Sequence, residues 1–78
     1  PGRYIAILWA ISLGLRFWSE IKHYAEGMVG YMPDNRFDAL LQNLVKYGFV
    51  EKTEDGNYKP VDPLLPKAIE LLRKKYRL

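Results

Sequence analysis

The sequence predicts a mainly helical α+β fold, and three observations predict it. Three segments with helical spacing of their apolar residues come first in the chain. Two strand-like segments follow, joined by a turn centred on Asp55 and Gly56, which is typical of a tight β-hairpin. A last helical segment completes the 78 residues, a length that suits one domain and no more.

The first helix is expected over residues 3–12. One stripe at helical spacing supports it, formed by Tyr4, Ile7, Leu8 and Ile11. Gly14 follows as a stop signal. Because Ile5 and Trp9 lie off this stripe, we expect the helix to be buried on more than one side, or to pack against something outside this chain.

Residues 15–18 are compatible with a minimal strand or with a turn. Ser19 can then cap a second helix over residues 20–26, because its hydroxyl accepts a hydrogen bond from a free N–H of the first turn. Gly27 is the expected end of this helix. Its predicted inward side chains are Ile21, Tyr24 and Ala25.

The third helix has the most regular pattern in the chain. Asp34 or Asn35 can cap it, and Gly48 lies just past its end, where a left-handed backbone conformation is expected. Its apolar stripe consists of Phe37, Leu40, Leu41, Leu44 and Val45. The opposite face is polar, so we expect it to meet solvent or a partner.

Residues 49–53 and 58–61 predict the two strands of the hairpin, and Pro60 marks the second as an edge strand. Pro66 suits the first position of a final helix that ends near Tyr76. The predicted inward side chains of this helix are Ala68, Ile69, Leu72 and Tyr76. Three helices followed at once by a hairpin and a C-terminal helix describe a winged helix-turn-helix.

Three stretches of the chain resemble the winged-helix region of archaeal AAA-type ATPases, which follows the P-loop nucleotide-binding domain in that family. They are residues 18–22 (WSEIK), 40–52 (LLQNLVKYGFVEK) and 58–63 (YKPVDP). The resemblance implies that residues 1–78 form a single winged-helix domain, a fragment of a longer protein. No G-x-x-x-x-G-K-[ST] motif occurs, so none of that family's nucleotide-binding residues can be assigned here.

The composition excludes several classes of function. The chain has no cysteine and a single histidine, His23, so a structural zinc site is excluded and no metal or cofactor is expected. No nucleophile–base pair or paired-carboxylate pocket is apparent, so we do not expect an enzyme. The apolar run 5–15 is too short to cross a membrane. The absence of cysteine fits a reducing compartment, and we expect a cytoplasmic location.

Two binding functions remain open, and the first is contact with double-stranded DNA. The second helix of a helix-turn-helix enters the major groove, and here that is the third helix of the chain. The candidate DNA-contacting residues are Asn35, Arg36, Gln42, Asn43, Lys46, Lys52 and Lys59. The domain would then serve an archaeal ATPase or a transcription-type regulator. Asp34, Asp38 and a net-negative hairpin argue against strong phosphate contact.

The alternative is a protein-interaction or regulatory lid domain. It would pack on an ATPase domain of the same chain or form a homodimer, without binding DNA. The low basicity of the third helix and of the hairpin favours it. Positive charge gathers instead in the last helical segment, where Lys67, Arg73, Lys74, Lys75 and Arg77 against Glu70 give a net +4. We interpret this cluster as cations at a helix C-terminus rather than as a nucleic-acid contact.

Five aromatic residues are expected in the core, because a small domain depends on aromatic burial. They are Trp9, Phe17, Trp18, Tyr31 and Phe49. An exposed Trp9 would instead indicate a partner surface.

Overall fold

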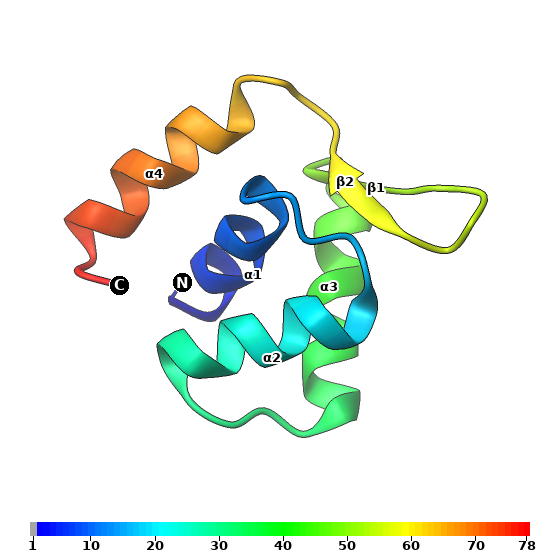
Figure 1. Cartoon of the computed structure of the whole chain (residues 1–78), viewed down its shortest axis with the longest axis horizontal. Helices are drawn as coiled ribbons and strands as arrows, with labels where there is room; N and C mark the ends of the chain where they lie inside the picture. The colour runs from blue at the N-terminus through cyan, green and yellow to red at the C-terminus, as the bar shows by residue number, and fades with distance from the viewer. Residues whose placement is uncertain (1) are drawn as a thin grey trace.

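The structure is a computed structural model and describes residues 2–78. The elements are α1 (Gly2–Ser12), α2 (Trp18–Val29), α3 (Asp34–Lys46), β1 (Val50–Lys52), β2 (Tyr58–Pro60) and α4 (Leu65–Lys75). This order confirms the predicted winged helix-turn-helix. In Figure 1, α1 lies between α3 on one side and α4 on the other, and the β-hairpin projects as the wing.

The core is built around α1, because α2, α3, α4 and β2 all pack on it. Six of its 11 residues are buried, including Ile5, Ile7 and Ile11. This confirms the expectation that the first helix is buried on more than one side. Opposite it lie Ile21 and Ala25 of α2, and Phe37 and its stripe on α3.

Helix α2 is longer than predicted at both ends. Phe17 occupies the N-cap position and no side chain caps the helix, so the prediction of Ser19 as the N-cap is wrong. Gly27 lies inside the helix, which ends at Val29 and is capped by Gly30, where the backbone has a positive φ of 94°. Tyr24 is exposed rather than inward, because α2 buries only the Ile21–Ala25 side of its surface.

Residues 15–17 form an irregular connection rather than a strand, and the turn lies just before them at residues 13 and 14. The carbonyl of Arg16 nevertheless accepts a hydrogen bond from the N–H of Tyr58 at 2.9 Å, so this segment fixes the base of the wing. The Arg16 guanidinium is itself held, because it donates to the carbonyls of Ile11 and Leu15.

Helix α3 follows its predicted pattern closely. Phe37, Leu41 and Leu44 are buried, and Gly48 has the expected positive φ of 84°. The cap is different: Pro33 occupies the N-cap position and the helix already includes Asp34, so neither Asp34 nor Asn35 caps it.

The wing is a two-stranded antiparallel hairpin in which Glu51 pairs with Lys59. Gly56 has a φ of 80° in its turn, a conformation that disfavours any residue with a Cβ. The Thr53 hydroxyl accepts a hydrogen bond from the N–H of Asn57 and closes the turn. The predicted hairpin centre is therefore confirmed.

Helix α4 has Pro66 in its first turn, and only Ile69 is buried. The prediction that Ala68, Leu72 and Tyr76 also point into the core is wrong, because all three are exposed. The reason is that α4 packs mainly against α1 and stands clear of α3 (Figure 1). Among residues 2–78, no helix has both the length and the apolar character needed to cross a membrane.

Candidate interaction surfaces

The structure places five of the seven predicted DNA-contacting residues in solvent. Asn35 and Arg36 lie in the first turn of α3, and Lys46 is its last residue. Lys52 and Lys59 lie on the two strands of the wing. These five side chains keep their exposure, as the helix-turn-helix pattern predicted.

The other two predicted residues are engaged within the domain. The Gln42 amide donates to Asp38 Oδ1 at 3.2 Å and to the Tyr58 hydroxyl at 3.1 Å. The Asn43 amide donates to the Tyr4 hydroxyl at 3.1 Å. Both side chains are partly buried and tie α3 to β2 and α1, so reading a base edge would require breaking these bonds.

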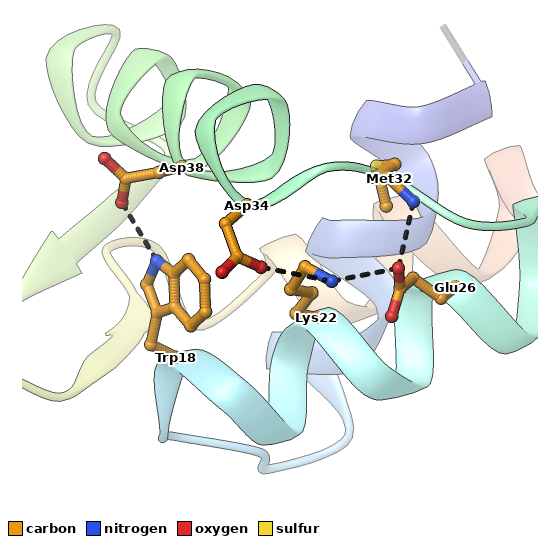
Figure 2. Close-up of polar contacts among 6 residues, drawn as sticks. All are labelled: Trp18, Lys22, Glu26, Met32, Asp34 and Asp38. Carbon is orange, nitrogen blue, oxygen red and sulfur yellow. Dashed lines mark hydrogen bonds and ion pairs between the residues drawn. The ribbon is translucent and has the colours of Figure 1, made fainter.

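The acidic residues at the start of α3 also have structural partners (Figure 2). Trp18 Nε1 donates to Asp38 Oδ1 at 2.9 Å, and the Trp18 ring packs edge-on against Phe37 at a centroid distance of 5.0 Å. Asp34 lies 3.4 Å from the ammonium of Lys22. The beginning of α3 is therefore fixed against α2.

Glu26 anchors the turn of the helix-turn-helix. Its carboxylate accepts a hydrogen bond from the N–H of Met32 at 2.9 Å and pairs with Lys22 at 3.0 Å (Figure 2). The Met32 N–H, followed by Lys22, holds the pKa of Glu26 below its ordinary value. The hydrogen bond from Lys22 to Glu26 in turn raises the pKa of that ammonium. Sequence reasoning missed this contact, although Glu and Lys four residues apart on a helix are a recognisable pair.

The electrostatics of α3 and the wing do not favour an anionic partner. The four basic residues on this surface are Arg36, Lys46, Lys52 and Lys59. The five acidic ones are Asp34, Asp38, Glu51, Glu54 and Asp55, so the net charge is −1. A DNA-binding surface ordinarily carries an excess of cations to neutralise phosphates.

A second surface is an apolar groove between α1, the C-terminal end of α3 and α4. It has a volume of about 480 Å³. Its lining is apolar or aromatic throughout and includes Tyr4, Leu8, Tyr47, Phe49, Leu72 and Tyr76. We call this surface the apolar groove, and its remaining lining residues are Ile5, Leu44, Leu65, Ala68 and Ile69.

The walls of the apolar groove are strongly exposed. Tyr47 keeps 66% of its accessible surface and Tyr76 keeps 47%. Leu64, the N-cap residue of α4, adds exposed apolar surface beside the groove and keeps 73% of its accessible surface. Contiguous exposed apolar surface of this kind marks an interaction site in a soluble domain.

The aromatic prediction is only partly confirmed. Phe17, Tyr31 and Phe49 are exposed, because the first two lie in connections between helices and Phe49 borders the apolar groove. Trp9 and Trp18 are partly buried. The guanidinium of Arg73 covers the Trp9 ring at 4.5 Å.

The structure also shows the surroundings of the basic C-terminal segment and of His23. Arg73 donates to the carbonyl of Leu78, and Lys74 pairs with Glu70 at 3.4 Å, so two of the cations contact the domain itself. His23 is exposed. Within residues 2–78, no cluster of three or more His, Asp or Glu side chains is arranged to hold a metal ion.

Comparison with known proteins identifies the fold family. The family model of the MCM protein C-terminal winged helix-turn-helix domain matches residues 2–61. No curated protein matches the chain. A Walker-type ATPase of Pyrococcus abyssi has a similar structure, with a TM-score of 0.77 and 38% identity over 87% of this chain. The aligned part is 19% of that ATPase.

The predicted resemblance to the winged-helix region of an archaeal ATPase is thereby confirmed. Helix α4, one wall of the apolar groove, lies beyond the residues that the family model matches. The chain belongs to the family of MCM protein C-terminal winged helix-turn-helix domains.

Proposed function

We propose that this domain is the accessory winged helix of an ATPase-type protein and that it acts through protein–protein contact at the apolar groove. The observation that carries the proposal is the exposed aromatic and aliphatic lining of that groove. The similarity to a Walker-type ATPase, of which the aligned part is 19%, supports an ATPase as the protein that carries the domain.

The chemistry of the apolar groove favours a protein partner over a small polar ligand. The polar side-chain atoms of its lining are tyrosine hydroxyls, and that of Tyr4 already accepts a hydrogen bond from Asn43. A metabolite site needs several convergent polar groups to fix orientation, whereas a protein interface uses aromatic and aliphatic anchors. We therefore assign the groove to a protein surface, in the first instance the ATPase portion of the parent protein.

Contact with duplex DNA is the second candidate function. It is favoured by the exposure of Asn35, Arg36 and Lys46 on α3 and of Lys52 and Lys59 on the wing. The net charge of −1 on this surface and the internal hydrogen bonds of two amides place it second.

Two variants with matched exposure separate the candidates. Tyr47→Ser removes an exposed aromatic ring from the groove, and the double variant Arg36→Ala/Lys46→Ala removes exposed charge from α3. Calorimetric titration measures binding of each to the ATPase portion of the parent protein, and anisotropy measures binding to duplex DNA over a range of salt. Circular dichroism verifies that both variants fold.

We expect Tyr47→Ser to weaken binding to the ATPase portion about 10-fold or more, as for an aromatic hot spot, and the double variant to leave it unchanged. The proposal is refuted if Tyr47→Ser has no effect and the double variant abolishes a salt-dependent affinity for DNA.

A further inference from the structure

The exposed side of α4 has the form of a helix-packing ridge. Leu64, Ala68, Leu72 and Tyr76 are spaced four residues apart, and all are exposed. Rows of side chains at this spacing are the ridges that fit into the grooves of a second helix. Helix α4 spans 11 residues, about 16 Å, so its exposed edge can accompany about three turns of a partner helix.

The apolar side of α4 is wider than α1 covers. Ile69 is its only buried residue, whereas Leu72, which lines the apolar groove, keeps 39% of its accessible surface. The opposite wall of the apolar groove supplies Tyr47 and Phe49, which are 66% and 47% exposed. A helix inserted between the two walls would contact both, with α1 as the floor.

Positive charge lines one end of this groove. The ammonium of Lys75 lies 6.0 Å from the ring centroid of Tyr76, a lining residue, and the exposed Arg77 follows directly. These two full charges exceed the half-charge of opposite sign at the C-terminal end of α4.

The nearby carboxylates do not cancel this charge. Glu70, the one acid of α4, lies on the far side of the helix from Leu72 and pairs with Lys74 at 3.4 Å. Asp62 lies at the opposite end of the groove, where its carboxylate accepts a hydrogen bond from the N–H of Leu64. The end beside Lys75 therefore attracts an anionic group.

We infer that the apolar groove binds an amphipathic helix of a partner protein, with apolar side chains along one face and acidic residues at the end that meets Lys75 and Arg77. This inference rests on the proposed function and specifies the chemistry of the partner. A second copy of the chain is the alternative occupant, and the sedimentation experiment below distinguishes it. Duplex DNA offers no apolar ridge for the groove.

Two synthetic peptides of about 14 residues test the charge rule. Both carry leucines at i, i+4, i+7 and i+11, and they differ only in having Glu or Lys at the flanking positions. Titration into the isotopically labelled domain, followed by amide chemical shifts and anisotropy, gives the site and the affinity. We expect the acidic peptide to perturb Leu72, Tyr76 and Tyr47 and to bind about 10-fold more tightly than the basic one.

Charge reversal at the end of α4 tests the role of the two cations. Lys75→Glu/Arg77→Glu should remove or reverse the preference for the acidic peptide. Lys67→Glu, an exposed charge reversal on the side of α4 that faces away from the apolar groove, is the control and should leave the preference unchanged. Added salt should weaken the binding of the acidic peptide more than the binding of the basic peptide.

The outcomes distinguish this inference from the proposed function. Equal affinity for both peptides overturns the charge rule, and the proposed function stands if Tyr47→Ser still weakens binding to the ATPase portion. If neither peptide perturbs the groove, the inference that the occupant is a helix is overturned. The proposed function again stands if Tyr47→Ser still weakens binding to the ATPase portion. If the domain sediments as a dimer and the Leu72→Ser variant sediments as a monomer, the occupant is a second copy of the chain. That result also overturns the inference.

Discussion

The position of α4 depends on one buried side chain, which makes its removal the sharpest test of the architecture. Ile69 retains 2% of its accessible surface, and every other residue of α4 is at least partly exposed. Ile69→Ala therefore removes the one fully buried apolar side chain of α4, while Leu65 stays packed against the core. Leu71→Ala, on the same helix with 62% exposure, is the matched control.

The expected loss follows from burial. Truncating a buried Ile to Ala costs about 2–5 kcal/mol, and we expect about 2 kcal/mol because the adjoining apolar groove gives the site room to relax. A domain of this length has a total stability of about 4–12 kcal/mol, so the loss is a substantial part of it. It corresponds to a fall in Tm of about 8–16 °C, whereas Leu71→Ala should change the stability by less than about 0.5 kcal/mol.

Urea unfolding followed by circular dichroism, together with a thermal melt, measures both variants. Arg73 covers Trp9, so Trp fluorescence reports separately whether α4 has left α1. Equal stability of Ile69→Ala and Leu71→Ala would show that α4 is not held by Ile69, and the reasoning about the groove wall would be refuted.

Three further predictions concern the helix-turn-helix and the wing. The pKa of Glu26 is lowered in the folded state, so its ionised carboxylate contributes to folding stability above pH 4.5, and this contribution is lost as the pH falls through the folded pKa. In Glu26→Gln, acid unfolding should therefore show a shallower dependence of the unfolding free energy on pH. Trp18→Phe removes the hydrogen bond to Asp38 and should cost about 1 kcal/mol in urea unfolding. Gly27→Ala should stabilise the domain by about 0.5–1 kcal/mol, because Gly27 lies within α2 and an added Cβ meets open space. Gly56→Ala should destabilise it by about 1 kcal/mol, because Gly56 has a positive φ. A lower Tm for Gly27→Ala than for Gly56→Ala would place Gly27 outside the helix.

Local signals were sufficient for the apolar stripe and the end of α3 and for the wing, and they misled at the start of α3 and at both ends of α2. The stripe from Phe37 to Leu44, the stop at Gly48 and the turn at Gly56 each depend on neighbours in sequence, and the structure confirms them. Ser19 and Gly27 are equally strong local signals. They were overridden because packing of Ile21 and its neighbours on α1 extends α2 past both.

The functional surfaces depended on contacts between distant residues, which a single sequence does not reveal. Gln42 lies on the predicted polar face, yet its partner Tyr58 is 16 residues away, and the partner of Asn43 is 39 residues away. The hydroxyls of Tyr58, which is buried, and of Tyr4, which is partly buried, need hydrogen-bond partners, and this need was the available signal. The apolar groove was missed because periodicity identifies an apolar side of α4 but not the distance of α4 from α3.

The central claim is that the partner binds at the apolar groove and not at the polar face of α3. An amide chemical-shift map of the labelled domain, recorded with the ATPase portion of its parent protein, tests this most directly. We predict that the perturbed amides cluster at Tyr47, Leu72 and Tyr76. Perturbation confined to Arg36, Ala39 and Lys52 would contradict it.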